Sequence, residues 1–166
     1  MRNVVIQSLD KIEKFLKYTV VISLFVMTIV TFSQIVLRYV FKAPTIWSEE
    51  VARYLYIWLV LLASAVAVRS NRHIRIDFLV NKFKPKTKFV IETIGLVLIL
   101  IFLVVLLREG ISIVQGTTNA KSQGIGIKMS YAYLAIPAGA SLMILFTIEM
   151  MVKHVKSFLI GQKEGE

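Results

Sequence analysis

The chain has 166 residues, of which 57% are hydrophobic and 18% are charged, and its mean hydropathy is +0.72. Soluble domains carry about 25% charged residues, so this composition excludes an ordinary soluble domain and indicates an integral membrane protein. The formal net charge of +10 is spread over short segments between apolar runs, whereas a nucleic-acid-binding domain gathers its basic residues on one soluble face. Nucleic acid is therefore not an expected partner, and the absence of cysteine excludes disulfides and thiolate metal sites.

The first segment, residues 1–17, is a charged leader that precedes a charge-free run at 18–37. Its apolar residues recur at helical spacing, namely Val5, Leu9, Ile12 and Leu16. This amphipathic pattern predicts a helix that lies in the membrane interface and then turns into the first span. The run at 18–37 has 20 residues, the length that a helix needs to cross a hydrocarbon core of about 30 Å. Because this run is longer than the core of a signal peptide, we expect it to be retained.

The second span, predicted at 49–68, begins within the stretch WSEEVARYLYIW. Ser48 is a suitable N-cap, and Glu49 and Glu50 would then meet the free amides at the start of a helix, with Arg53 one turn further on. Local helix-end electrostatics therefore explain much of this stretch. One acid would suffice for that purpose, however, and ionisable groups near a membrane core usually face protein rather than lipid. A docking role at the outer surface is the second interpretation.

The segment between the second and third spans is strongly basic and starts with RSNRHIRID. We expect it to contact lipid headgroups and neighbouring cytoplasmic loops through Arg69, Arg72, His73, Arg75 and Asp77. A metal site needs three or four ligands, and the only other histidine is His154 in the tail, so no metal site is predicted. The third span is predicted at 89–107, with Glu92 near its start.

The fourth span is predicted at 129–148, and a tail follows at 149–166. Small residues in the second and fourth spans provide surfaces for close helix packing. Pro137 is expected to kink the fourth span. The outer loop before this span, GTTNAKSQGIGIKMS, is rich in Gly, Ser, Thr and Asn and is predicted to be irregular.

Counts of lysine and arginine orient these spans. The leader, the loop at 69–88 and the tail hold 14 basic residues, against 6 in the two remaining loops. By the positive-inside rule the first three segments are cytoplasmic. The sequence thus predicts an all-α integral membrane protein with four transmembrane helices, an N-terminal interfacial amphipathic helix, both termini in the cytoplasm and one membrane domain over residues 1–166.

Catalytic motifs are absent from the sequence: it holds no nucleophile–base pair, phosphate-binding loop or metal cluster. Only two histidines are present, and both fall at cytoplasmic positions, so hydrolytic catalysis has no support. We therefore expect no enzymatic activity, no catalytic residue and no cofactor.

Three stretches resemble the small membrane subunit (DctQ-like) of the tripartite ATP-independent periplasmic (TRAP) transporters of bacteria. They are LRYVF at 37–41, IWSEEVARYLYIW at 46–58 and AVRSNRHIRIDFL at 67–79, in this order around two spans. The second stretch is most similar to the sialic acid branch of the family. One departure is the sequence LLASA in the second span, where the family often has a Leu-Gly pair, so helix packing at that point is expected to differ.

The resemblance implies a role in a three-part importer of the bacterial inner membrane. In that family a periplasmic binding protein delivers an organic acid, such as sialic acid or a four-carbon dicarboxylate, to a large membrane subunit that couples uptake to sodium. The small subunit acts as a fixed scaffold and helps to form the docking surface. The resemblance therefore implies three partners, namely the large subunit, the periplasmic binding protein and membrane lipids, and an interface that includes Trp47, Glu49, Glu50, Arg53 and Arg38.

The residues leave three functional hypotheses open, of which the third is a membrane-bound sensor or assembly factor. The leading one is a non-catalytic scaffold and docking subunit of a sodium-coupled organic acid importer. The alternative is a self-sufficient small carrier or channel that works as a homo-oligomer, which predicts a polar stripe along one span at membrane depth. The apolar cores of the spans hold only scattered Ser, Thr and Gln, which favours the scaffold.

Overall fold

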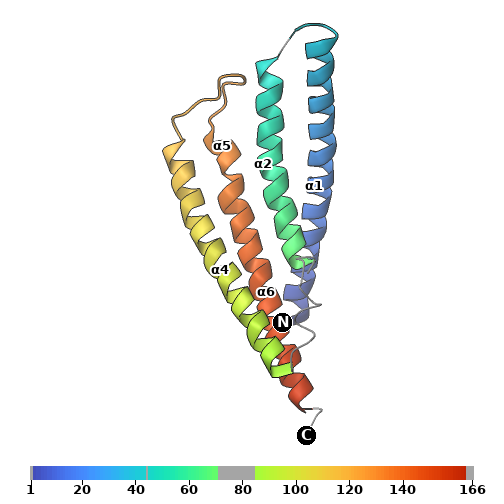
Figure 1. The fold of residues 1–166 in the computed structure, drawn as a ribbon, viewed down its shortest axis with the longest axis vertical. Helices are drawn as coiled ribbons and strands as arrows, with labels where there is room; N and C mark the ends of the chain where they lie inside the picture. Colours follow the sequence, from blue (N-terminus) through green and yellow to red (C-terminus); the bar gives the residue numbers. More distant parts are fainter. Residues whose placement is uncertain (1, 44, 71–84, 164–166) are drawn as a thin grey trace.

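The computed structural model describes residues 2–43, 45–70 and 85–163, and these form long helices (Figure 1). The helices are α1 (Arg2–Tyr39), α2 (Ile46–Arg69), α4 (Pro85–Gly116), the short α5 (Ser130–Tyr133) and α6 (Ala135–Lys163). Four stretches are long and apolar enough to cross a membrane, at Gln7–Tyr39, Ile46–Arg69, Thr87–Gly116 and Ser130–Phe158. The predicted all-α fold with four spanning helices is thus confirmed, and the chain is a multi-pass membrane protein.

The helices form a row in which α2 and α6 occupy the middle (Figure 1). Helix α1 packs against α2, and α4 packs against α6. Helices α2 and α6 run in the same direction, and both chain termini lie toward the end of the bundle where α2 finishes (Figure 1). We call this the inner end, and we call the opposite end, which carries the loops at 40–45 and 117–129, the outer end, after the orientation predicted from the sequence.

The leader differs from its prediction, because no turn separates it from the first span. Helix α1 is continuous over 38 residues, about 57 Å at 1.5 Å per residue. The reason lies in its apolar side: Leu9 and Leu16 are buried against the bundle core. The leader therefore extends the first span and packs on the other helices instead of bending into the membrane plane.

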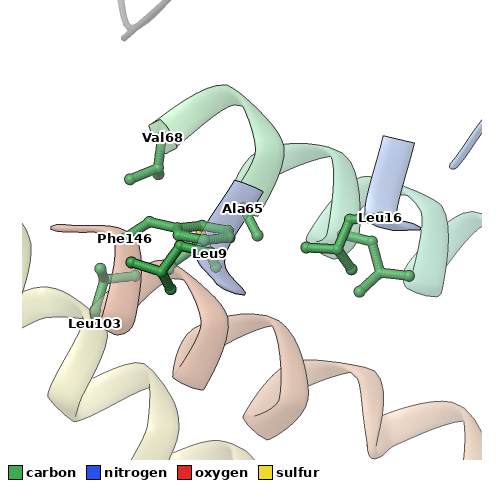
Figure 2. Close-up of a cluster of buried hydrophobic side chains, with 8 residues drawn as sticks. Leu9, Leu16, Ala65, Val68, Leu103 and Phe146 are labelled. Atoms are coloured by element: carbon green, nitrogen blue, oxygen red, sulfur yellow. The ribbon is translucent and has the colours of Figure 1, made fainter. Parts of the chain in front are cut away.

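The hydrophobic core lies toward the inner end and draws side chains from all four spanning helices (Figure 2). Its buried members are Leu9, Leu16, Leu62, Ala65, Val68, Leu103, Met143 and Phe146. Phe146 of α6 is fully buried, at the point where side chains from the other helices converge (Figure 2).

Close packing in the middle of the row depends on two glycines. A Cβ atom at Gly139 of α6 would lie 2.8 Å from the Cβ of Leu61 in α2. A Cβ atom at Gly110 of α4 would lie 2.7 Å from a methyl carbon of Ile136 in α6. Small residues let membrane helices approach closely where no hydrophobic driving force separates protein from lipid. The Gly139 contact bears out the predicted packing role of the small residues in the fourth span, whereas Gly110 of α4 was not predicted.

The fourth span consists of α5 and α6 with Leu134 between them, and Pro137 is the third residue of α6. Proline has no amide hydrogen, and its ring disfavours a continuous helix through the residue four positions earlier. The indole Nε1 of Trp58 donates a hydrogen bond of 3.2 Å to the Tyr131 carbonyl near this break. The interruption covers one residue: Leu134 keeps helical backbone angles, and the Ala138 amide donates to the Leu134 carbonyl at 3.1 Å, so the kink expected at Pro137 stays a prediction.

Candidate functional site

The outer end is organised around the carboxylate of Glu50, near the start of α2. This carboxylate accepts hydrogen bonds from the backbone amides of Gln123 (3.1 Å), Gly124 (2.8 Å) and Ile125 (3.2 Å). It also accepts a hydrogen bond from the hydroxyl of Ser122, a residue that is buried. Successive backbone amides that converge on one oxygen pair form an anion-binding nest. We call this arrangement the Glu50 site.

Two glycines of the outer loop, Gly124 and Gly126, allow the backbone to approach the Glu50 carboxylate closely. Gly124 has no side chain to obstruct it: a Cβ atom there would lie 2.8 Å from a Glu50 carboxylate oxygen. The loop is closed further by the Gly126 amide, which donates to the Ser122 carbonyl at 3.1 Å, and Gly126 has a φ of 70° that favours glycine. The segment that was predicted to be irregular is thus a compact loop, held to α2 by one carboxylate.

The start of α2 differs from its prediction. The N-cap is Thr45, and the helix begins at Ile46, so the assignment of Ser48 as the N-cap was wrong. The Ser48 side chain is buried, and its hydroxyl donates to the Thr45 carbonyl at 3.0 Å and lies 2.6 Å from the Thr45 hydroxyl. This earlier start places Glu50 on the second turn, within reach of the outer loop.

The other residues predicted for a partner interface also lie at the outer end, on exposed positions. Glu49 and Arg53 form an ion pair of 2.9 Å with side chains that are 63% and 61% exposed. Trp47 is about half exposed, and the Arg38 guanidinium lies 5.7 Å from the Tyr39 ring centre. The structure therefore separates the two neighbouring acids: Glu50 binds the chain's own loop, whereas Glu49 and Arg53 face outward.

At the inner end, Arg69 is the centre of an ion cluster that joins three helices. Its guanidinium contacts Asp10 (2.6 Å) and Glu13 (2.6 Å) of α1 and Glu149 (3.0 Å) of α6. It also donates to the Leu9 carbonyl at 2.7 Å and lies 5.4 Å from the centre of the Phe146 ring. We call this group the Arg69 cluster.

Two lysines complete the charge balance of the Arg69 cluster. Lys17 contacts Glu13 at 2.6 Å, and Lys153 contacts Glu149 at 2.7 Å. Three acids therefore face three bases, and the Arg69 side chain is only 6% exposed. The expectation that Arg69 contacts lipid headgroups is corrected, because its five N–H donors are directed into the bundle, where carboxylates and a carbonyl receive them. The remaining residues of that prediction, Arg72, His73, Arg75 and Asp77, lie outside the described residues.

A smaller contact links α4 to α6 at the same end. His154 Nδ1 lies 3.4 Å from a Glu92 carboxylate oxygen. The His154 ring stacks on Phe89 with centroids 4.8 Å apart, and Phe89 also stacks on Phe158 at 4.0 Å. Glu92, which the sequence placed near the start of the third span, thus faces another helix of its own chain.

The sequence reading missed the partners of both charged centres. For Glu50, two features of the sequence were informative. The start of α2 has two acids, one more than helix capping needs, and the outer loop contains a Ser-Gln-Gly turn whose amides can donate hydrogen bonds. For Arg69, the signal was a set of unexplained acids, Asp10, Glu13 and Glu149, beside apolar segments. Neither signal states which residues meet, because the contacts span 56 to 80 positions of sequence.

Comparisons with known proteins agree over most of the chain. Residues 27–157 match the family described as tripartite ATP-independent periplasmic transporters, DctQ component. The chain is 30% identical to the sialic acid TRAP transporter permease protein SiaT of Haemophilus influenzae (strain 86-028NP), over 95% of this chain and 24% of that protein. It is 30% identical to the sialic acid TRAP transporter small permease protein SiaQ of Vibrio cholerae, over 76% of this chain and 73% of SiaQ.

A further relative is the C4-dicarboxylate TRAP transporter small permease protein DctQ of Rhodobacter capsulatus. It is 33% identical over 59% of this chain and 44% of that protein. The chain spans about a quarter of the length of SiaT, so the similarity to that larger permease concerns one part of it.

Proposed function

This chain belongs to the DctQ component family of the tripartite ATP-independent periplasmic transporters, and we propose that it is the non-catalytic scaffold and docking subunit of a sodium-coupled organic acid importer. Its relatives serve sialic acid and C4-dicarboxylate systems, and the family is one of transporter components without enzymatic activity. The proposed partners are a large permease subunit, a periplasmic binding protein and membrane lipids. The proposed location is the bacterial inner membrane with both termini in the cytoplasm.

The observation that carries this proposal is the Glu50 site. A carboxylate near the end of a spanning helix is a natural candidate for binding a transported cation or a substrate. Here its oxygens are occupied by three backbone amides and one hydroxyl of the chain's own outer loop. The carboxylate therefore holds the outer loop in place, and its oxygens are already occupied by that loop. This is what we expect for a scaffold with a preformed docking face.

The buried polar groups also favour a scaffold over a self-sufficient carrier. In the part of the chain that the structure describes, buried polar residues are few: Ser48, Ser122, Ser130 and Thr147. The first three lie at the outer end, and Thr147 donates to the Met143 carbonyl of its own helix at 2.8 Å. The Arg69 cluster lies at the inner end, so these residues form no polar path along the bundle.

The first experiment tests assembly. An affinity-tagged form of this chain should co-purify with a large permease subunit of the same transporter, and the pair should support sodium-gradient-driven uptake into proteoliposomes once the binding protein is added. Uptake by this chain alone would establish the carrier alternative and overturn the proposal.

The second experiment tests orientation. Reporter fusions at Lys42 and Lys82 should report opposite sides of the membrane, because the positive-inside rule places the first in the periplasm and the second in the cytoplasm. The same side for both fusions would contradict the proposed topology.

A further inference from the structure

Two lysines stand directly opposite each other in the outer loop. Lys121 and Lys128 form an isolated antiparallel bridge. The backbone hydrogen bonds on either side of the bridge run from Ser122 to the Ile127 carbonyl (2.8 Å) and from Met129 to the Ala120 carbonyl (2.9 Å). These flanking bonds identify Lys121 and Lys128 as a non-hydrogen-bonded pair, in which opposite Cα atoms are about 4.5 Å apart and both side chains project from the same face.

This arrangement is unfavourable for the isolated loop. Like charges directly opposite each other across a strand pair are destabilising. Both lysines are exposed, and no ion pair to an acid relieves either of them within the described ranges of the chain. The Glu50 site and the positive φ of Gly126 maintain the loop despite this repulsion. The fold thus places two exposed lysines opposite each other on the same face of the strand pair.

A partner that brings carboxylates to this surface would remove the repulsion and form charge-assisted hydrogen bonds with both side chains. We propose that the Lys121–Lys128 pair is a contact point for acidic side chains of the periplasmic binding protein. This inference rests on the proposed function, and it assigns the docking chemistry to residues that neither the sequence motifs nor the family resemblance singled out.

The position of the pair favours a protein partner over a lipid or a free organic acid. The loop lies beyond the outer ends of α4 and α5 (Figure 1), and it combines polar residues such as Ser122 and Gln123 with the exposed Ile127, a mixture typical of a surface that contacts a protein. A small acid would find two flexible ammonium groups on an open surface, without the enclosing walls that bind small ligands. A protein surface can contact both lysines and the surrounding loop together.

The surrounding charge supports an acidic partner. The segments 38–53 and 108–128 carry six basic residues, Arg38, Lys42, Arg53, Arg108, Lys121 and Lys128, against three acids, Glu49, Glu50 and Glu109. Glu49 is paired with Arg53 and Glu50 is occupied by the loop amides. The field of the outer end is therefore positive, and such a field steers an oppositely charged partner toward the surface and accelerates association.

The test uses the complex of this chain with its large permease subunit, held in nanodiscs, and the purified periplasmic binding protein of the same transporter. Lys121→Glu places a carboxylate opposite Lys128, so it relieves the repulsion in the loop while it removes the paired positive charge. We expect the Kd for the binding protein to rise at least about fivefold, and its dependence on salt concentration to become weaker. Hydrogen exchange of the loop amides should stay the same or become slower.

Matched variants separate charge from folding. Lys121→Arg keeps the charge and should keep the Kd of the wild-type complex. Lys121→Gln removes one charge and should give an intermediate Kd. Lys156→Glu changes the net charge by the same amount as Lys121→Glu but lies at the inner end, so it is the control and should leave the Kd unchanged. Unchanged docking of the Lys121→Glu complex would overturn this inference and leave the proposed function intact. A wild-type complex that shows no docking at all would overturn both.

Discussion

The two charged centres of the molecule carry opposite charges and bind different kinds of group. At the outer end, one carboxylate binds neutral backbone amides and orders a loop. At the inner end, one guanidinium binds three carboxylates and joins α1, α2 and α6. The outer centre joins one helix to a surface loop, whereas the inner centre joins three helices beside the hydrophobic core.

This difference predicts different consequences of mutation. The loss of the Arg69 charge removes the group that joins α1, α2 and α6 and weakens the packing between these helices. The loss of the outer charge frees a loop and leaves the helices in place. We therefore expect stability to depend on the inner end and docking to depend on the outer end.

The largest effect is expected for Arg69→Met. Removal of one partner from a buried ion group costs about 3–5 kcal/mol, and here it leaves the poorly exposed Glu13 and Glu149 with only the exposed Lys17 and Lys153 as partners. Thermal unfolding in detergent should show a large drop in Tm. The control is Lys153→Met, which changes the same charge at a side chain that is 60% exposed and should change Tm little. An equal effect of the two variants would contradict the central role of Arg69.

Arg69→Lys sharpens this prediction. Lysine keeps the positive charge but lacks the planar fork that reaches Asp10, Glu13 and Glu149 together. We expect a Tm between those of the wild-type protein and Arg69→Met. A Tm equal to that of the wild-type protein would indicate that charge alone, without the geometry of the guanidinium, holds the cluster.

The next effect concerns the packed region between the two ends. Gly139→Ala places a Cβ atom 2.8 Å from the Leu61 Cβ, and overpacking of this kind costs about 1–3 kcal/mol. Gly95→Ala is the matched control, since its Cβ atom meets nothing within 4 Å. Unfolding of the two variants in the same detergent should show a lower Tm for the first only. If both variants match the wild-type protein, the contact between α2 and α6 is not tight.

A local effect is expected for Glu50→Gln. The amide side chain keeps one acceptor oxygen but loses the negative charge that strengthens the bonds to the loop. Hydrogen exchange at Gln123, Gly124 and Ile125 should accelerate on the order of tenfold, with little change in global unfolding. Glu49→Gln is the control, and it should leave these amides unaffected. A large drop in Tm for Glu50→Gln would contradict the separation between the two ends.

The smallest effect on stability is expected for Arg53→Gln. An exposed pair at this spacing contributes about 0.3–0.5 kcal/mol, so Tm should be nearly unchanged. If the pair belongs to a partner surface, co-purification with the large permease or docking of the binding protein should fall. Normal assembly and normal docking would remove Arg53 from the proposed interface.

Much of the architecture was predictable from the sequence. Charge-free runs of about 20 residues can satisfy their backbone only as helices in a membrane, so the four spans followed from composition. The small-residue contact at Gly139 followed from the chemistry of glycine. Two details differed, the continuous α1, which is held by the burial of Leu9 and Leu16, and the N-cap at Thr45, and both concern helix ends.

The sequence by itself determined that Glu50 and Arg69 stand at the two ends of α2, because the spacing of apolar residues fixes the length of that helix. Only the tertiary structure decided what each one binds. Their partners come from segments 56 to 80 positions away in the chain, and a charge pattern does not encode which distant segments meet. The reason is physical: helix formation in the membrane depends on each residue's own backbone and side chain, whereas an ion contact depends on how whole helices pack.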